Sequence, residues 1–198
     1  MTGARTGWRV PLVAVGAMVV IAIGAWIARS GEDRGTSSRP SRAVATVTTI
    51  VAAQPEQRRA FAVLSQPAQT PPPARRAAIV RVLSASRPLG VNLALARRVR
   101  TGAGEDAWVV PGDGSVCVIR DLTATAGCNT TREAIAHGMA LLERDPLAHG
   151  YLLLGIVPNS VRRVRVRSDR GVVATVPVSR NVYAYLSTVP VRGEPVRG

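Results

Sequence analysis

The sequence contains no lysine, so all 26 of its basic residues are arginine, and its formal net charge is +14. The chain is also rich in Ala, Val, Gly and Pro. Together these biases are typical of a GC-rich genome, so much of the basic character reflects codon usage rather than function. The missing lysine excludes a P-loop, whose motif needs Gly-Lys-Ser/Thr before a helix. We interpret the glycine-bearing stretches GAGED (102–106) and PGDGS (111–115) as turns between strands.

Aromatic residues make up only 4% of the chain, and Phe61 is the one phenylalanine. The core must therefore be built from Val, Leu, Ile and Ala, and short valine-rich runs favour strands over helices. Once a membrane segment and its flanking unstructured stretches are set aside, about 140 of the 198 residues remain for a folded part, which is enough for one domain with a modest core.

Short catalytic and metal-binding motifs are also missing. The sequence has no G-x-S-x-G, H-E-x-x-H, S-x-x-K or C-x-x-C motif. Its two histidines, His137 and His149, are spaced too widely from each other and from the cysteines for a structural zinc site, whose ligands usually pair within about five residues. We predict no catalytic residue, no metal and no cofactor, and keep an enzyme of a class without short motifs as an alternative.

The only cysteines, Cys117 and Cys128, are separated by ten residues. In an oxidising compartment this spacing predicts one disulfide that closes a short loop. In the cytosol the same residues would be two ordinary thiols.

An uncharged apolar run covers residues 10–28, with the sequence VPLVAVGAMVVIAIGAWIA. Nineteen residues are enough to span a hydrocarbon core, Arg9 and Arg29 flank the run, and Trp8 and Trp26 lie near its ends, where interfacial aromatics are common. The run is too long for a signal-peptide core and lacks an A-x-A cleavage site. We predict a short N-terminal tail (1–9) and an uncleaved, single-pass transmembrane helix (10–28).

The orientation of this helix follows from two opposing arguments. More arginines follow the helix than precede it, which by itself points the C-terminal part inward. Long domains, however, cross membranes largely regardless of charge, and a cysteine pair at this spacing favours an oxidising exterior. We therefore predict a plasma-membrane protein whose C-terminal domain lies outside, and keep an inward-facing basic domain as the alternative.

The rest of the chain predicts an α+β fold. Residues 29–54 form a flexible tether, in which the β-branched run at 43–51 favours a short strand over a continuation of the tether, and residues 55–190 form the domain. Two helices come first, one of about ten residues from Pro55 and one over 74–86. An antiparallel β-meander of six to eight strands follows, with a helix inserted after Thr130. Residues 191–198 are predicted to be a loose tail.

The most basic stretch is VRRVRVRSDRG, at 161–171. Because strand side chains alternate between faces, Val164 and Val166 point to the core and Arg163, Arg165 and Arg167 point to solvent. Nucleic-acid binding would need stacking aromatics or a recognisable fold, and neither is present. We predict that these three arginines bind an anionic ligand.

Several runs after residue 95 resemble functionally unassigned secreted or membrane-anchored proteins of high-GC actinobacteria. The resemblance lies in ARRVRTGAGEDAWVVPGDGSVCVIRD, GCNTTREAIAHG, GYLLLGIVPNSVRRVRV and DRGVVATVPVSRNVY, which together span about half of the chain. It implies an external single-pass protein and a Cys117–Cys128 pair, and it transfers no catalytic residue.

These observations favour a membrane-anchored extracytoplasmic domain without catalytic activity, used for binding, envelope structure or regulation. Its expected partners are the membrane, through residues 10–28, and an anionic envelope polymer, lipid head groups or an acidic protein. The alternatives are the enzyme named above and an inward-facing domain that binds nucleic acid or anionic lipid.

Overall fold

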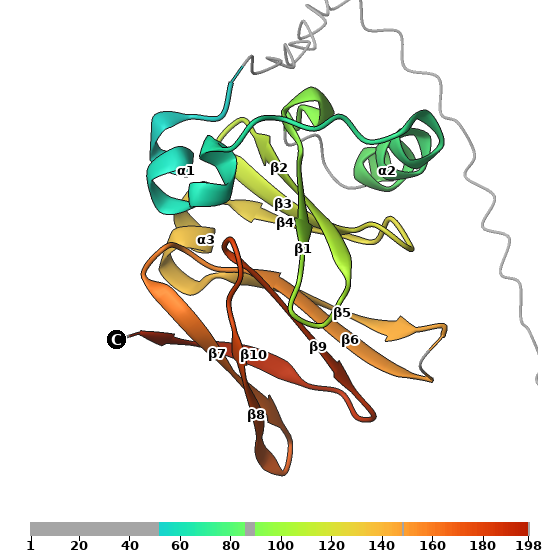
Figure 1. The fold of residues 1–198 in the computed structure, drawn as a ribbon, viewed down its shortest axis with the longest axis vertical. Helices are drawn as coiled ribbons and strands as arrows, with labels where there is room; N and C mark the ends of the chain where they lie inside the picture. Colours follow the sequence, from blue (N-terminus) through green and yellow to red (C-terminus); the bar gives the residue numbers. More distant parts are fainter. Residues whose placement is uncertain (1–51, 86–89, 148, 198) are drawn as a thin grey trace, which may run out of the picture. The chain divides into compact units, whose positions relative to one another are not determined.

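The computed structural model describes residues 52–85, 90–147 and 149–197 (Figure 1). The predicted N-terminal tail (1–9), transmembrane helix (10–28), strand at 43–51 and nearly all of the tether lie outside these residues. Within the described ranges, no helix is both long enough and apolar enough to cross a membrane.

The helical elements are short. They are α1 (Pro55–Ala60), the 3-10 helix η1 (Ala62–Ser65), α2 (Pro73–Ala85), the 3-10 helix η2 (Leu93–Leu95) and α3 (Thr131–His137). Two helices were predicted at the start of the domain, and both are present. The third begins after Thr130 as predicted, and the Thr130 hydroxyl accepts a hydrogen bond of 3.2 Å from the Glu133 amide.

The first predicted helix is shorter than expected because the chain becomes extended at Phe61. The Phe61 side chain is fully buried. The next two amides donate to asparagine side chains rather than to helix carbonyls: Ala62 to Asn159 (2.9 Å) and Val63 to Asn181 (3.0 Å). These distant acceptors end α1 and position η1.

In the described part of the chain, ten antiparallel strands form three sheets. Sheet A has the order β1–β2–β3–β4, with β1 (Arg97–Arg100), β2 (Asp106–Gly112), β3 (Ser115–Arg120) and β4 (Ala126–Thr130). Sheet B has the order β5–β6–β9, with β5 (Met139–Asp145), β6 (Gly150–Ile156) and β9 (Val182–Ser187). Sheet C has the order β10–β7–β8, with β7 (Val161–Ser168), β8 (Gly171–Pro177) and β10 (Arg192–Arg197).

The α+β class and the antiparallel pairing are therefore confirmed, but three predictions were wrong. Six to eight strands were predicted, whereas the described residues form ten. The strands do not form a single meander, because β6 pairs with β9 and the intervening β7–β8 hairpin belongs to another sheet. Residues 192–197 are not a loose tail, because they form β10 and pair with β7 along its length.

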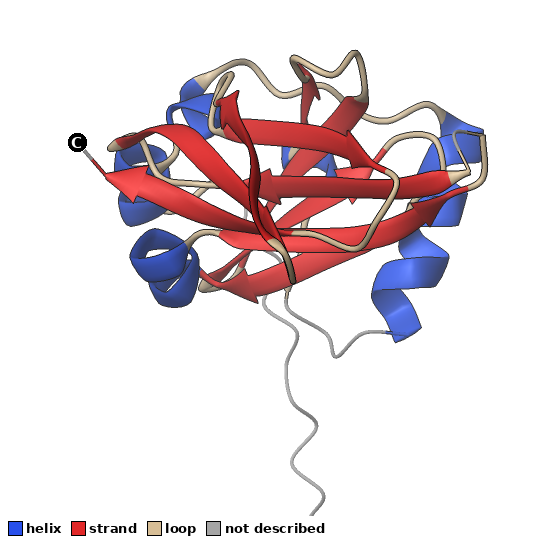
Figure 2. Ribbon diagram, turned by 90° about the horizontal axis from the view of Figure 1, so that it is seen from below, coloured by secondary structure: helices blue, strands red, loops and turns tan. Residues whose placement is uncertain are grey.

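The sheets lie in layers, with sheet B in the middle (Figure 1). Leu152 and Leu154 of β6 pack into the core shared with sheet A, whereas Leu153 packs into the core shared with sheet C. The outer face of sheet A is covered by α2, whose Ile79 packs against Trp108. Seen from below, the strands fill the middle of the domain, with α1 and α3 on the C-terminal side and α2 on the opposite side (Figure 2). On the outer face of sheet C, Arg163 and Arg165 are exposed among the residues that the structure describes.

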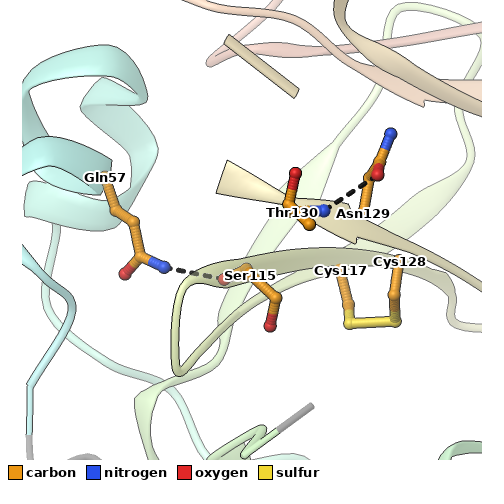
Figure 3. The surroundings of a disulfide bond; sticks show 6 residues. All are labelled: Gln57, Ser115, Cys117, Cys128, Asn129 and Thr130. Carbon is orange, nitrogen blue, oxygen red and sulfur yellow. Dashed lines mark hydrogen bonds between the residues drawn. A yellow bond between two sulfur atoms is a disulfide. The ribbon is translucent and has the colours of Figure 1, made fainter. Parts of the chain in front are cut away.

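The predicted disulfide is present (Figure 3). Cys117 of β3 and Cys128 of β4 are direct partners in the register, and their Cα atoms lie 4.1 Å apart. The Cys117 side chain is fully buried under α2. The bond therefore joins β4, an edge strand of sheet A, covalently to its neighbour.

Gln57 anchors α1 to the turn between β2 and β3. Its side chain is fully buried. Its Nε2 donates to the carbonyl of Ser115 (2.7 Å; Figure 3) and to that of Gly112 (3.0 Å). Nε2 also lies 3.1 Å from the Thr131 hydroxyl at the start of α3. One amide thus holds two helices against the same hairpin.

Tyr183 of β9 fills the space between sheets B and C, where it is 2% exposed. Two glycines make room for its ring: Gly155 on the neighbouring β6 and Gly193 on β10. A Cβ atom at either position would lie within 2.5 Å of the ring or its hydroxyl. Burial raises the pKa of the Tyr183 hydroxyl well above its ordinary value.

We expect stability to decline as the pH rises above about 10, because unfolded Tyr183 ionises there while the folded residue keeps its proton. The raised pKa makes its full contribution to the free energy of unfolding below about pH 10. This contribution is lost as the pH rises further. No lysine titrates in this range, and both cysteines are bonded. Urea unfolding of the full chain between about pH 8 and pH 11 should show this decline, with a flatter profile for Tyr183→Phe. Parallel profiles would contradict the assignment to Tyr183.

Candidate functional site

The outer face of sheet C carries the arginines that the sequence analysis selected. Along β7, Val164 and Val166 are fully buried, whereas Arg163 and Arg165 are exposed and Arg167 is half-buried. The predicted alternation is confirmed. We call Arg163, Arg165 and Arg167 the arginine row.

The row lies in the centre of sheet C because β7 is the middle strand. Directly paired residues of neighbouring strands share a face. On β10 the partners of the row are Val196, Glu194 and Arg192, and on β8 they are Pro177, Thr175 and Val172. The row is therefore bordered by one more arginine, one carboxylate and several small or apolar side chains.

Positive charge dominates this sheet. Residues 161–177 and 192–197 contain seven arginines and two acidic residues. The Glu194 carboxylate lies 3.5 Å from Arg192 and 3.7 Å from Arg167. Within the described part of the chain, neither Arg163 nor Arg165 forms an ion pair within 4 Å, although Glu194 lies opposite Arg165 on β10 and pairs instead with Arg167 and Arg192. Guanidinium groups stay charged at any physiological pH, so the row keeps a net positive charge.

A hollow of about 690 Å³ opens at one end of the row. It lies between the β7–β8 turn and the segment that connects β9 to β10. Arg167 belongs both to the row and to the lining of this hollow. The basic surface thus continues from the flat sheet into a concave site.

Comparisons with known proteins were made at three levels. No family model, curated protein or solved structure matches this chain. The chemistry of the site is therefore the basis for inferring what the protein does.

The remaining candidate residues do not assemble into a catalytic or metal centre. His137 is exposed on the last turn of α3, with its Nε2 atom 3.8 Å from Glu133 of the same helix. His149 lies in the β5–β6 turn with a φ of 50°. Among the described residues, no group of three His, Cys, Asp or Glu side chains is arranged to hold a metal, and the disulfide occupies both sulfur atoms that a zinc site would need.

A buried charge cluster, which the sequence analysis missed, joins sheets A and B. Arg120 ends β3, and its side chain is 1% exposed. Its guanidinium contacts the carboxylates of Glu105 (3.0 Å), Glu143 and Asp145. Burial opposes the charge on Arg120, but the hydrogen bonds that its guanidinium donates to the three carboxylates outweigh this effect and raise the pKa of Arg120 further.

This cluster is structural rather than a binding site, because its cation is enclosed and already holds three anions. Glu143 and Asp145 lie on β5, and Glu105 lies between β1 and β2. One side chain therefore fixes the position of sheet B relative to sheet A. Sheet C, with the arginine row, is built on sheet B.

Proposed function

We propose that the protein is a membrane-anchored extracytoplasmic domain without catalytic activity, which binds anionic envelope polymers on the outer face of sheet C. The observation that carries this proposal is the arginine row, in particular Arg163 and Arg165, which are exposed and form no ion pair within 4 Å in the described chain. The apolar run at 10–28 supports the anchor, and the disulfide supports an oxidising location.

The geometry of the row suits a polymer with repeated negative charges. Alternate residues of a strand are about 7 Å apart, so the three guanidinium groups form a short, straight line of positive charge. Guanidinium binds phosphate and carboxylate through paired hydrogen bonds. An extended polyanion can therefore contact successive arginines without base stacking or a deep pocket.

We expect the triple replacement R163Q/R165Q/R167Q to weaken the binding of polyphosphate and of polygalacturonate by about tenfold at low salt. Each exposed charge contact contributes about 0.5 kcal/mol, and about 1.4 kcal/mol corresponds to a factor of ten. Affinity is measured by fluorescence titration of the full chain in a neutral detergent, and added salt should reduce the difference.

The matched control is R81Q/R132Q/R144Q, which removes the same charge from exposed positions on α2, α3 and β5. It should change the affinity by less than about twofold, because only the overall attraction is reduced. Equal weakening by both triple variants would show that polyanions respond to net charge alone, and would refute the proposed role of the row.

The proposed location has a separate test. Intact cells are treated with a protease that cannot cross the membrane, and the two cysteines of untreated cells are alkylated under denaturing conditions with and without reductant, because Cys117 is buried in the folded domain. We expect the domain to be digested and Cys117 and Cys128 to react only after reduction. Survival of the domain together with thiols that react without reductant would establish the inward-facing alternative.

A further inference from the structure

The hollow at the end of the arginine row has the composition of a binding site for a small anion. Three arginines contribute to its lining, Arg167 and Arg192 from paired positions on β7 and β10 and Arg170 from the β7–β8 turn. One carboxylate, that of Asp169, shares the lining. Its volume of about 690 Å³ lies within the range of about 300–1,000 Å³ that is usual for small-molecule sites.

One buried donor atom of a lining residue has no hydrogen-bond acceptor. The Nε atom of Arg167 is buried and has no hydrogen-bond acceptor, the only such side-chain nitrogen or oxygen among the residues that the structure describes. The Glu194 carboxylate is 3.7 Å away, which is beyond hydrogen-bond distance. Leaving a buried donor unsatisfied is costly. Because this atom is closed to solvent in the structure, an oxyanion in the hollow would gain the bond once the Arg167 side chain turned its Nε atom toward it.

The other wall of the hollow is apolar. Val173 of β8 and Val189 of the β9–β10 connection are each 44% exposed, and Pro190 and Val191 lie beside them. Exposed valines next to guanidinium groups favour a ligand with two parts, an anionic head and an aliphatic tail.

We propose that the hollow binds a small amphiphilic anion, namely an alkyl phosphate or alkyl carboxylate. The head group lies between Arg167, Arg170 and Arg192, and the alkyl part lies against the valine and proline wall. The site shares Arg167 with the arginine row, but it does not require the row to bind a polymer.

Glu194 competes with this ligand. It lies between Arg167 and Arg192 at 3.7 Å and 3.5 Å, so it partly neutralises two of the three cations that the head group needs. An incoming phosphate must displace it. Replacement of Glu194 by glutamine keeps the shape of the side chain, removes the competing charge and strengthens binding.

Calorimetric titration of the full chain in dodecyl maltoside tests the proposal, with butyl phosphate, inorganic phosphate and butanol as the probes. We expect butyl phosphate to bind about tenfold more tightly than inorganic phosphate, because part of the butyl chain leaves water, and butanol not to bind. R170Q/R192Q should weaken butyl phosphate binding about tenfold, and Glu194→Gln should tighten it severalfold. Thermal unfolding of each variant confirms that the fold is retained.

The variant R163Q/R165Q separates this site from the row, because it removes two row arginines and leaves the lining of the hollow intact. It should weaken polyphosphate binding and leave butyl phosphate binding within about twofold. Equal affinity for butyl phosphate and inorganic phosphate, or equal loss of butyl phosphate binding in R163Q/R165Q and R170Q/R192Q, would overturn the proposed site. Unchanged polyphosphate binding in R163Q/R165Q would instead remove the function proposed for the row and leave the hollow in place.

Discussion

Replacement of Arg120 by methionine is expected to lower the free energy of unfolding by about 3–5 kcal/mol, the usual result of removing one partner from a buried ion pair. Methionine fills a similar volume but carries no charge. The carboxylates of Glu105, Glu143 and Asp145 would then lose their shared cation inside the protein, where solvation by water cannot replace it.

Chemical denaturation of the full chain measures this loss, and Arg144→Met is the matched control. Arg144 lies between Glu143 and Asp145 on β5 but is exposed, so its replacement should cost less than about 0.5 kcal/mol. Neutralising the three acids together with Arg120→Met should recover much of the stability, because no unpaired charge then remains. A loss of less than about 1 kcal/mol for Arg120→Met alone would show that the cluster is hydrated and does not hold the sheets together.

Replacement of Gly155 by alanine is expected to destabilise the protein by about 3 kcal/mol, at the upper end of the usual cost of overpacking. A Cβ atom at this position would lie 2.5 Å from the Met139 carbonyl oxygen and 2.5 Å from the Tyr183 ring. Gly155 is in β6, the middle strand of sheet B, so neither neighbour can move away easily. Gly102→Ala is the control, because its Cβ would contact nothing within 4 Å.

Gly193→Ala offers a sharper comparison, because its Cβ would meet the Tyr183 hydroxyl at 2.4 Å without meeting backbone. Tyr183→Phe removes that hydroxyl and should recover part of the stability lost in Gly193→Ala. The same change should help Gly155→Ala less, because the Met139 carbonyl remains in contact. Double-mutant cycles measure both recoveries. Equal recovery for the two glycines would contradict this account of the packing around Tyr183.

Features set by short-range patterns could be predicted from the sequence. The Val-Arg alternation of β7 identified which side chains face solvent, because the strand period depends only on backbone geometry. Asp113-Gly114 identified the β2–β3 turn, where Gly114 has a φ of 62°. Thr130 identified the start of α3 through the hydrogen bond that its hydroxyl accepts.

Features set by distant pairing could not be predicted in the same way. Residues 192–197 contain Gly193 and Pro195, which have low strand propensity. The structure explains both: Gly193 makes room for Tyr183, and Pro195 is tolerated because β10 is an edge strand of sheet C. The division into three sheets depends on β9 pairing with β6 across the intervening hairpin, and no local signal encodes that choice.

The candidate site was likewise predictable where it depends on a short-range pattern and unpredictable where it depends on distant pairing. The direction of the arginine row was visible in the sequence, but the hollow depends on residues 189–192 lying beside the β7–β8 turn. The sequence does contain a pattern from which the Arg120 cluster could have been predicted. On β5, Leu141, Glu143 and Asp145 occupy alternate positions and so share a face, and Leu141 is in the core. Two acids on a core-facing side require a buried cation nearby.

The central position of sheet B has a consequence for the order in which the domain folds. Its last strand, β9, ends at Ser187, yet this strand completes the layer on which both other sheets pack. A nascent chain that stops before β9 therefore exposes apolar surface on both sides of an incomplete sheet. Closure requires contacts between segments far apart in the chain, which is typical of slow folding. The domain should consequently stay unfolded until nearly all of it has been synthesised, a state that remains compatible with passage across a membrane as an extended chain.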